Sequence, residues 1–472
     1  MVEHFDDLEE DFARVGRWIA GYFEHPEAYR VLPDVRPGEL AARLPAAAPE
    51  RGEAFERILD DFERLIVPAT THWNHPRFFA YFATSAAPAA VAAEALAATL
   101  DVKAMLWRTS PAATELEQVT MRWLGRLLGL PDSWTGIIYD TASIAGFTAL
   151  AAARDALLPD IRRRGMFELD RPLRVYVTEH THSHIEKAAI ALGIGQENVV
   201  PVACDAAFRM RPEALAERVD ADAADGMQPL ATVATVGTTS TTAIDPLPAI
   251  ADVTQRYGMW LHVDAAYAGM AAMLPEFGDL LAGVERADSL VVNPHKWMFV
   301  PMDLSVLFLK DEATVRRAFS LVPEVLATPE GDEVNYMNYG LQLGRRFRAL
   351  KLWFVLRRYG AEGIRAKLRE HIALAQTFAQ WVRADSQWEV LAPHPFSLVC
   401  FRYGAGDPAE LDAFNERLMN AVNATGELFI SHTKIDGRFA LRLAIGNLRT
   451  TRADVERAWE ILRREAERLA AG

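Results

Sequence analysis

Cysteine is scarce in this sequence. Only Cys204 and Cys400 occur among 472 residues, and they lie far apart. They match no spacing of metal ligands, and two such residues are too few for a disulfide framework. The scarcity favours a reducing, cytoplasmic setting.

An excess of positive charge is also missing. Lysine and arginine number 50 against 64 aspartate and glutamate residues, which gives a formal net charge of −14. This balance argues against nucleic acid or an anionic membrane surface as the main partner. The start, MVEHFDDLEEDF, is acidic where a signal peptide is basic, and no apolar run approaches the length of a membrane span. We therefore expect neither a nucleic-acid nor a membrane partner.

Hydrophobic residues make up 50% of the chain, enough for a large core and two or three domains. We expect residues 1–88 to be helical, because apolar residues recur at three- and four-residue steps on both sides of a loop at 33–52. These apolar residues are Phe5, Leu8, Phe12, Val15, Ile19, Tyr22, Phe55, Ile58, Phe62, Leu65 and Ile66. Two such helices are too small for a core of their own, so we expect them to clasp a neighbour, which in a dimer is the partner subunit.

From about residue 130, short β-rich runs such as GIIY and LRVYVT alternate with helical segments. Alternation of this kind predicts an α/β fold with a mainly parallel sheet covered on both faces. We assign residues 89–347 to this large domain. Residues 348–472 mix amphipathic helices with strands such as PFSLVCFRY, which predicts a small C-terminal α+β domain.

A lysine and an aspartate follow two neighbouring apolar runs. The run SLVV stops at Asn293-Pro294 and delivers Lys296, because proline neither extends a strand ladder nor continues a helix. The preceding run, MWLHV, delivers Asp264. In open α/β sheets ligands bind at the carboxyl ends of the strands. We expect Lys296 and Asp264 to meet there.

Pyridoxal phosphate (PLP) chemistry requires this pair of residues. A lysine forms a Schiff base with the cofactor aldehyde, and an aspartate keeps the pyridine nitrogen protonated so that the ring accepts electrons. The alternative for Lys296 and Asp264 is a buried salt bridge, or a lysine exposed on a loop. That alternative does not explain why several other strands end in polar groups.

Three further turns carry candidate cofactor ligands. The turn before the helix at ASIAGFTAL offers Thr141, Ala142 and Ser143 as a phosphate cradle, although a simple helix cap has the same pattern. At the next turn His182 is placed to stack on a planar ring, or only to cap a helix. Thr239 follows a third strand. His182 and His184 also have the spacing of metal ligands on a strand, but no Cys or carboxylate cluster supports a metal, so we expect none.

Eight segments together resemble one known family. They are HPRFFAYF (75–82), SPAATELE (110–117), DTAS, THSH, VGTT, HVDAAYAG, NPHKW and LGRRFRALKLWF (343–354), and they cover nearly the whole chain in order. They resemble the PLP-dependent group II amino-acid decarboxylases, most closely the aromatic-L-amino-acid decarboxylases. The resemblance implies a type I aminotransferase-like fold with a seven-stranded sheet. It also implies an obligate homodimer with active sites at the subunit interface.

The resemblance also assigns roles motif by motif. Lys296 is similar to the Schiff-base lysine, Asp264 to the pyridine partner and His182 to the histidine that stacks over the ring. Ala266 would pack under the ring. The remaining cofactor ligands implied are Thr141, Ala142, Thr239, Asn293 and His295. The implied reaction is decarboxylation of an aromatic L-amino acid to the amine and CO₂.

The chain departs from the family at a loop tyrosine that protonates the carbanion. The segment AFSLVPEVLATPEG (318–331) aligns with that loop and has Val325 at the tyrosine position. Valine cannot donate a proton. Family members without the tyrosine can consume oxygen and release an aldehyde, so an aldehyde synthase is the main alternative. Otherwise Tyr336, Tyr339 or His182 supplies the proton.

The substrate pocket is the second departure. Lys103 and Met105 stand where the family has apolar or aromatic residues, so an acidic substrate is a further alternative unless Lys103 points away. The other expected pocket residues are Trp73, Tyr81, Phe82, Thr84 and Val325. Because Trp73, Tyr81 and Phe82 would give the pocket aromatic walls, an aromatic amino acid remains the first expected substrate. A non-catalytic regulatory homologue is the alternative from another class, opposed by the presence of Lys296, Asp264 and His182.

Overall fold

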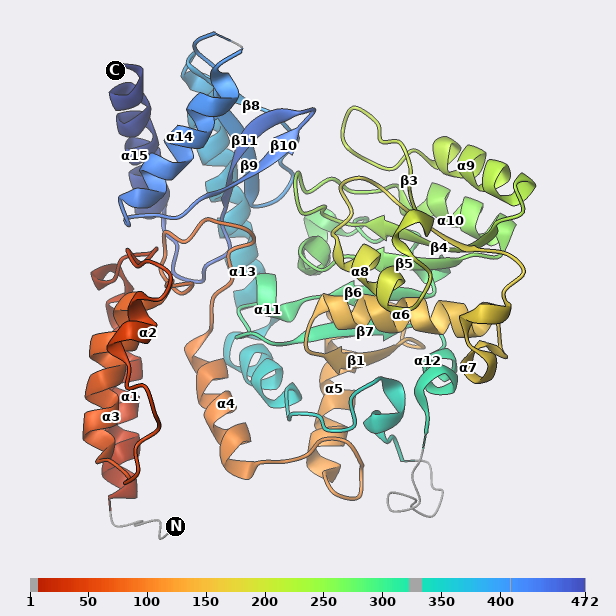
Figure 1. The fold of residues 1–472 in the computed structure, drawn as a ribbon, viewed down its shortest axis with the longest axis horizontal. Coiled ribbons are helices and arrows are strands. Elements are labelled where there is room, and N and C mark those ends of the chain that lie inside the picture. Colours follow the sequence, from red (N-terminus) through yellow and green to blue (C-terminus); the bar gives the residue numbers. More distant parts are fainter. Residues whose placement is uncertain (1–6, 322–332, 408, 472) are drawn as a thin grey trace. The chain divides into compact units, whose positions relative to one another are not determined.

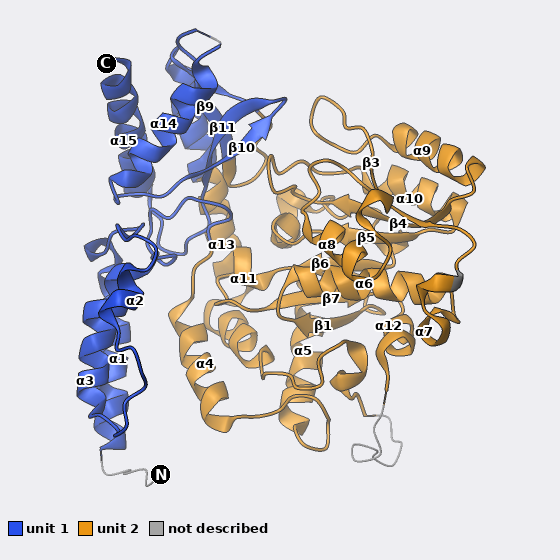
Figure 2. Ribbon diagram, viewed as in Figure 1, with its two compact units in different colours: residues 1–83, 374–391, 399–472 blue, residues 84–373, 392–398 orange. Residues whose placement is uncertain are grey.

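The computed structural model describes residues 7–321, 333–407 and 409–471. It divides into two compact units, coloured separately in Figure 2. The first unit comprises Met1–Ala83, Leu374–Leu391 and Val399–Gly472, and the second comprises Thr84–Ala373 and Ala392–Leu398. None of the helices among the described residues is both long and apolar enough to cross a membrane.

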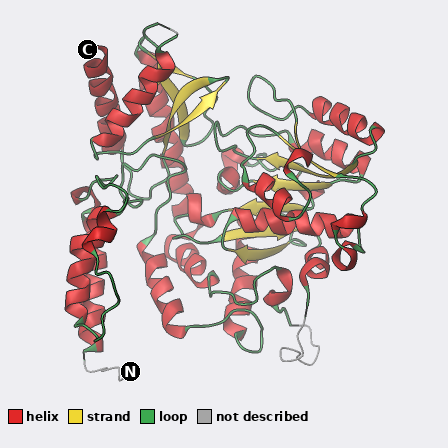
Figure 3. Cartoon of the chain, in the orientation of Figure 1, coloured by secondary structure: helices red, strands yellow, loops and turns green. Residues whose placement is uncertain are grey.

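The second unit contains a sheet and its covering helices (Figure 1; Figure 3). Its strands are β1 (Thr135–Tyr139), β2 (Leu173–Val177), β3 (Val199–Pro201), β4 (Gln228–Thr235), β5 (Trp260–Asp264), β6 (Ser289–Val292) and β7 (Ser305–Leu309). Its helices are α4 (Pro88–Leu100), α5 (Pro111–Leu127), α6 (Ala142–Leu157), α7 (Ile161–Arg164), α8 (His184–Ala191), α9 (Pro212–Ala224), α10 (Leu247–Tyr257), α11 (Pro294–Trp297) and α12 (Glu312–Phe319). Helix α13 (Ala349–Ala384), which is kinked at Gly360, begins here and ends in the first unit.

The seven strands form one sheet in the order β1-β7-β6-β5-β4-β2-β3. The pairs β2–β3, β2–β4, β4–β5 and β5–β6 are parallel, whereas β7 is antiparallel to both β6 and β1. The prediction of a mainly parallel seven-stranded sheet is therefore confirmed. Because β7 alone is reversed, β1 runs in the same direction as β6, and their carboxyl ends lie at the same edge.

Strand register places the two predicted site strands side by side. Asp264 on β5 is paired with Thr235 on β4 and with Val291 on β6. Beyond this row the N–H of Ala265 donates to the Val291 carbonyl at 3.0 Å, and the N–H of Asn293 donates to the Ala266 carbonyl at 3.1 Å. The segments that follow β5 and β6 are therefore hydrogen-bonded to one another just past the sheet.

Burial explains why these short runs are strands. Every residue of β6 and β7 is buried, as expected for central strands covered on both faces. Two clusters of buried apolar side chains join the sheet to α6, α8 and α12. Alanine-rich α6 packs across β4, β5, β6 and β7, because small side chains let a helix approach a sheet closely.

The first unit has its own sheet and core. Its strands, in the order β10-β11-β9-β8, are β10 (Ser431–Ile435), β11 (Arg438–Ala444), β9 (Leu398–Tyr403) and β8 (Trp388–Val390). Its helices are α1 (Leu8–Glu24), α2 (Glu39–Arg43), α3 (Phe55–Asp61), α14 (Leu411–Ala424) and α15 (Arg452–Ala470). A cluster that includes the fully buried Phe378 and Phe401 joins this sheet to α14 and α15. The α+β character expected near the C-terminus is present in this unit.

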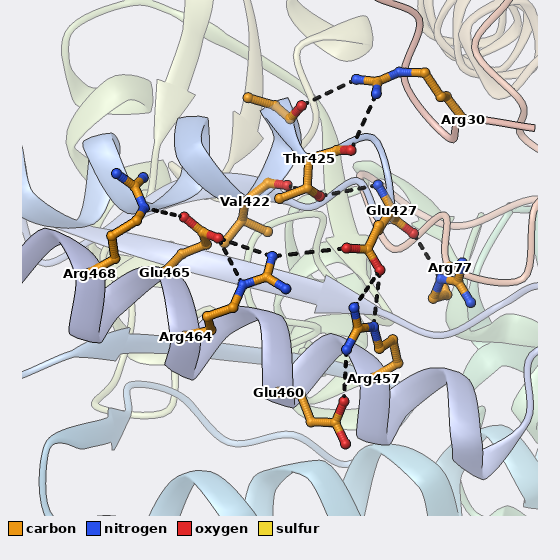
Figure 4. A network of polar contacts seen from close by, with 11 residues as sticks. Arg30, Arg77, Val422, Thr425, Glu427, Arg457, Glu460, Arg464, Glu465 and Arg468 are labelled. Carbon is orange, nitrogen blue, oxygen red and sulfur yellow. Dashed lines mark hydrogen bonds and ion pairs between the residues drawn. The ribbon is translucent and has the colours of Figure 1, made fainter.

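A polar network fastens α15 to the segment that follows α14 (Figure 4). The carboxylate of Glu427 accepts from Arg457 at 2.8 Å and lies 3.9 Å from Arg464. The carbonyl of Glu427 accepts from Arg77 at 2.8 Å. One residue of the turn thus holds two distant segments. Because these side chains are partly exposed, each ion pair contributes only about 0.2–1 kcal/mol.

One local prediction differs from the structure. The stretch 33–52, expected to be a loop, contains the helix α2. Gly38 precedes this helix with a φ of 86°, a left-handed conformation that glycine adopts without strain. The strand-to-helix turn expected at His182 is present, and α8 begins at His184, so the alternative of a strand with both histidines on one face does not apply. No group of three potential His, Cys, Asp or Glu ligands occurs within the described part of the chain.

Candidate active site

Lys296 lies in α11, a four-residue helix directly after β6. Asn293 precedes the helix in an extended conformation, and its carbonyl accepts the N–H of Lys296 at 2.8 Å. Pro294 occupies the first helical position, where its missing N–H costs nothing. The sequence Asn-Pro therefore turns the chain sharply, as predicted, and sets the lysine beside the sheet edge. The Lys296 side chain is half-buried.

Trp297 anchors this short helix. The indole is fully buried, donates from Nε1 to Nδ1 of His371 at 3.0 Å and stacks on Tyr267 with ring centroids 4.9 Å apart. Tyr267 itself follows β5. A four-residue helix has little stability of its own. The buried indole of Trp297 therefore holds α11 in place, and with it the backbone of Lys296.

Asn293 and His295 hold the chain on either side of Lys296. The side-chain oxygen of Asn293 accepts from the Ser305 hydroxyl at 2.6 Å. Nδ1 of His295 accepts the N–H of Leu304 at 3.0 Å. Both side chains are buried and reach toward the start of β7. Here they fasten α11 to the sheet, which is compatible with but different from the cofactor contacts that the resemblance implied.

Asp264 is the last residue of β5 and is 5% exposed. Its Oδ1 accepts the N–H of Ala266 at 3.0 Å. Burial acts to raise the pKa of this carboxyl, but His184, Lys296 and the Ala266 N–H together lower it below its usual value. Asp264 is therefore ionised at neutral pH, as a partner for a protonated pyridine nitrogen must be. Its interaction with Lys296 shows that the structure brings together the two residues singled out from the sequence.

The predicted phosphate cradle is the start of α6. Thr141 precedes the helix in an extended conformation, and its side chain makes no capping hydrogen bond. Its N–H is accepted by Asp140 at 3.1 Å. Thr141 and Ala142 are half-buried and follow β1, whose carboxyl end lies at the same sheet edge as Lys296. The first N–H groups of this 16-residue helix are suited to a phosphate.

The loop after β4 requires a glycine at position 237. Gly237 has a φ of +88°, and a Cβ on it would lie 2.4 Å from Cβ of Ala268. This close approach lets the turn carrying Thr238 and Thr239 pack against the segment after β5. The Thr238 hydroxyl accepts the N–H of Ala243 at 3.0 Å, whereas Thr239 is half-buried one residue further on. Thr239 is therefore on the loop that follows the strand next to Asp264.

Three histidines interact electrostatically with the Asp264 carboxylate. His182 is exposed on the turn before α8, whereas His184 and His262 are buried at 3% and 0% exposure. Burial lowers the pKa of both buried imidazoles to about 4 although Asp264 acts in the opposite direction. Although His182 as a whole is exposed, partial desolvation of its ring by the neighbouring groups and the charge of Lys296 also lower its pKa. These histidines are accordingly neutral at pH 7.

Sequence reasoning missed His262 and valued His184 only as a possible metal ligand. His262 precedes Asp264 by two residues on β5, so the alternation of a strand places both on one face. That signal was present in the sequence. His184 gave no such signal, because its surroundings depend on how α6 packs against α8.

The donor set fits PLP. A half-buried amine, a buried carboxylate with a lowered pKa and the start of a long helix lie on segments that leave one edge of the sheet. Ala266 is small and 7% exposed, so a flat ring can approach the segment after β5.

The expected substrate-pocket residues fall into separate groups. Trp73, Tyr81 and Phe82 belong to the first unit, where the rings of Trp73 and Tyr81 stack at 5.9 Å. Trp73 and Tyr81 are 42% and 53% exposed, whereas Phe82 is buried. Thr84, half-buried, is the first residue of the second unit. Whether these residues line one pocket stays a prediction.

The second pocket group lies between α4 and α5. Lys103 is exposed, and its ammonium group is bonded to the carboxylate of Asp101 and, at 3.1 Å, to the Asp101 carbonyl. Met105 is half-buried, and its carbonyl accepts the N–H of Met337 at 3.1 Å. Val325, the residue aligned with the loop tyrosine, lies outside the described residues.

Tyr336 and Tyr339, the alternative proton donors, are each 3% exposed. The guanidinium of Arg345 lies 4.3 Å from the ring centroid of Tyr336. The Tyr339 carbonyl accepts the Tyr139 hydroxyl. Burial raises the pKa of Tyr336 well above its usual value and that of Tyr339 to about 12. Both tyrosines are thus packed as core residues, which disfavours them as proton donors.

Comparison with known proteins agrees with this geometry. Residues 37–404 match the model of the pyridoxal-dependent decarboxylase conserved domain. Tryptophan decarboxylase 2 of Oryza sativa subsp. japonica is 39% identical over 98% of this chain and 95% of its own length. Phenylacetaldehyde synthase of Arabidopsis thaliana is 40% identical over 96% of this chain and 94% of its own. The crystal structure of Oryza sativa TDC with PLP and tryptamine superposes with a TM-score of 0.95 at 35% identity, over 99% of both chains.

These similarities extend over the sheet, the helices around it and the first unit alike. They confirm the type I fold and the PLP cofactor expected from the sequence. This chain belongs to the pyridoxal-dependent decarboxylase family and is a PLP-dependent amino-acid decarboxylase.

Proposed function

We propose that this enzyme decarboxylates an aromatic L-amino acid to the corresponding amine and CO₂. The observation that carries the proposal is the pairing of Asp264 and Lys296 on hydrogen-bonded segments beyond β5 and β6. Relatives of nearly full length that are named tryptophan and tyrosine decarboxylases support an aromatic substrate.

Each site residue then has a defined task. We assign Lys296 to covalent attachment of the cofactor aldehyde, Asp264 to the pyridine nitrogen and His182 to stacking over the ring. Ala266 would support the opposite face. The remaining contacts assigned are Thr141 and Ala142 to the phosphate, Thr239 to the ring oxygen, and Asn293 and His295 to the segment that carries Lys296.

PLP, when bound, supplies an electron-poor ring that accepts the electron pair released as CO₂ leaves. An ionised Asp264 would hold a proton on the pyridine nitrogen and so keep that ring electron-poor. The Ala266 N–H bond and burial by neighbouring strands keep the carboxylate in one orientation. Trp297 fixes α11 through its bond to His371, so the helix would keep its place while the Lys296 amine exchanges with the substrate amine.

An acidic substrate is less well supported than an aromatic one. Lys103 was the residue that suggested it, and its charge is already paired with Asp101 on an exposed turn. An acidic substrate would have to displace that carboxylate. The aromatic side chains of Trp73, Tyr81 and Phe82 remain the proposed walls of the side-chain pocket.

Aldehyde formation is the second candidate reaction. Val325 removes the hydroxyl group that the resemblance places in the catalytic loop, and relatives named phenylacetaldehyde synthase match this chain as well as decarboxylases do. We place amine formation first because relatives named tryptophan and tyrosine decarboxylases match this chain over nearly its full length. The N–H of a neutral His182 could still relay a proton from water.

We further propose a cytoplasmic homodimer clasped by the N-terminal helices. Leu8 and Phe12 on α1 and Phe55 and Ile58 on α3 are between 39% and 62% exposed, so these helices carry apolar surface that the rest of the chain leaves uncovered. Light scattering on the purified protein should give twice the chain mass of 52.5 kDa. A monomer would overturn the clasp.

The deciding experiment is product analysis. The PLP-loaded enzyme is supplied in air with tryptophan, tyrosine, phenylalanine, glutamate and aspartate, while CO₂, amine, aldehyde and peroxide are measured together. We expect CO₂ and amine in equal amounts from an aromatic substrate. Aldehyde with peroxide would assign the second reaction, and turnover of glutamate or aspartate alone would overturn the aromatic substrate.

A further inference from the structure

The imidazole of His184 is enclosed between α8 and α6 and has no role in the proposed mechanism. It is 3% exposed, and its Nε2 has no hydrogen-bond partner among the described residues. A Cβ on Gly146 of α6 would lie 2.8 Å from this Nε2 and 2.9 Å from Cδ2. The ring therefore occupies space that exists only because position 146 is glycine.

His184 makes two contacts to one atom of His182. Its backbone N–H donates to Nδ1 of His182 at 3.2 Å, and its ring Nδ1 lies 3.1 Å from the same atom. A backbone N–H can only donate, so Nδ1 of His182 must present a lone pair. The short contact between the two ring nitrogens then requires that His184 carry its proton on Nδ1.

These contacts define the tautomers of both rings. With Nδ1 of His182 acting as acceptor, the proton of its neutral ring is on Nε2. With Nδ1 of His184 acting as donor, its neutral ring has a bare Nε2, the atom that faces Gly146. A second proton on His184 would bury an unpaired N–H against the helix, which costs free energy.

We propose that His184 is a positioning residue that fixes His182 as a neutral imidazole with its single proton on Nε2. Because Gly146 has no side chain, it leaves the space beside α6 that the His184 ring occupies. The part of this role that concerns catalysis rests on the proposed function, in which His182 stacks on the cofactor.

The charged surroundings favour the neutral form of the pair. The titratable and charged groups that face it are Asp264 and His262 on β5, Lys296 on α11 and Lys187 on α8. Partial desolvation of the ring, Lys296 and Lys187 lower the pKa of His182, and only Asp264 acts against them. In the loaded enzyme the protonated pyridine nitrogen of PLP would engage Asp264, so a further positive charge on His182 would be disfavoured there as well.

A fixed neutral ring has two consequences for the reaction. It adds no positive charge beside Lys296 when the lysine amine must exchange with the substrate amine. It also keeps one N–H, on Nε2, at the edge of the ring away from His184. A freely rotating His182 would present either nitrogen, and protonation at low pH would add a charge.

The first test reads the tautomer directly, without turnover. Nitrogen-15 NMR of the PLP-loaded enzyme, labelled at histidine and assigned with His182→Gln, should show an unprotonated Nδ1 and a protonated Nε2 on His182. A proton on Nδ1 of His182 in the unchanged enzyme would overturn the proposal. Because this readout needs no substrate, it stands even if the enzyme fails to decarboxylate aromatic amino acids.

The second test distinguishes two properties of the side chain at position 184, its hydrogen-bond donor and its volume. His184→Leu fills the space without a donor, whereas His184→Asn offers an amide N–H close to the position of Nδ1. Loss of one hydrogen bond should lower kcat about tenfold in His184→Leu with little change in KM, and His184→Asn should recover most of it. The acid limb of the kcat/KM profile should move to higher pH in His184→Leu only, because the neutral form of His182 would lose the hydrogen-bond donor on which it depends. An unchanged pH profile with lowered thermal stability would mean a merely structural role.

The third test uses Gly146. Gly146→Ala should disturb the enzyme as His184→Leu does, but should add little in a His184→Ser background, where the ring is gone. Two controls are matched: Gly363→Ala lies in α13 with the nearest atom 3.6 Å away, and His180→Leu changes a histidine on the same turn that packs on Phe208 instead. Additive effects of the Gly146 and His184 changes would contradict the assigned contact.

Discussion

A carboxylate that is buried yet ionised defines the chemistry of Asp264. Two opposing effects act on it. Burial favours the protonated form, whereas a protonated His184, Lys296 and the Ala266 N–H favour the charged form, and Lys296 and the N–H remain at pH 7, where His184 is neutral. The charged form wins because these partners are all in place before any ligand binds. A side chain of the same shape but without charge therefore removes the function and keeps the packing.

We expect Asp264→Asn to fold, to bind PLP more weakly and to lose about 10³-fold in kcat, because a neutral amide cannot hold a proton on the pyridine nitrogen. Steady-state kinetics and the absorbance of the bound cofactor measure the two effects. Asp252→Asn is the matched control, since Asp252 is 73% exposed in an ion pair with Arg286 and should leave kcat unchanged. Near-normal turnover of Asp264→Asn would contradict the assignment of this residue.

The sequence predicted Lys296 and Asp264 for a physical reason. Both follow apolar runs that end at turns, and the ends of parallel strands meet at one edge, so the pattern alone determines proximity. The contact between His184 and Gly146 could not be predicted, because it joins two helices whose mutual packing depends on the volumes of many side chains. The hydrogen bonds by which Asn293 and His295 hold α11 to the sheet could not be predicted from the sequence either.

At the scale of elements, β7 shows that a hydrophobic pattern predicts a strand but not its direction. An apolar run has the same hydrophobicity in either direction, so its sequence does not distinguish a parallel from an antiparallel strand. The connection from β6 to β7 spans 12 residues, 293–304, which is close to the shortest length of a parallel crossover. Neither strand composition nor connection length therefore predicts the reversal of β7.

The elements around β1 are joined by a buried ion pair. The carboxylate of Glu117 on α5 accepts from Arg345 at 2.7 Å and from the N–H of Ile138 on β1 at 2.9 Å. Arg345 also donates to the carbonyls of Ala104 and Ile138, at 3.1 and 2.8 Å. Helix, strand and the segment before α13 thus share one charged centre.

Glu117→Gln should destabilise the protein by about 3–5 kcal/mol, because the guanidinium would stay buried without its counter-charge. Urea unfolding followed by tryptophan fluorescence measures the change. Glu115→Gln, two residues earlier on the exposed side of the same helix, should change stability by no more than about 0.5 kcal/mol. Equal effects of the two substitutions would show that the buried pair is not maintained in solution.

At the scale of the whole molecule, four buried histidines make stability depend on pH. Burial lowers the pKa of His75 and His295 to about 3 and that of His184 and His262 to about 4. In the unfolded chain each imidazole binds a proton near its ordinary pKa of about 6.5. Below that pH the unfolded chain holds more protons than the folded one, so acid favours unfolding.

The unfolding free energy should therefore be constant above about pH 6.5 with respect to these groups. It should fall between pH 6.5 and 4 by about 1.4 kcal/mol per pH unit for each histidine. Urea midpoints at pH 7 and pH 5 measure this loss. His75→Asn should reduce the difference between the two values, and equal midpoints in the unchanged protein would contradict the burial of these imidazoles as neutral rings.

The pairing of Thr235, Asp264 and Val291 in one row across three strands has a consequence for how this enzyme tolerates insertions. Successive side chains of a strand face opposite sides, so one residue added or removed within β5 would turn Asp264 to the other face while leaving the hydrogen-bonded ladder intact. Lengthening the surface turns would not shift this register. Evolution of new specificity in this scaffold is therefore expected to proceed through loops of changing length around strands of fixed length.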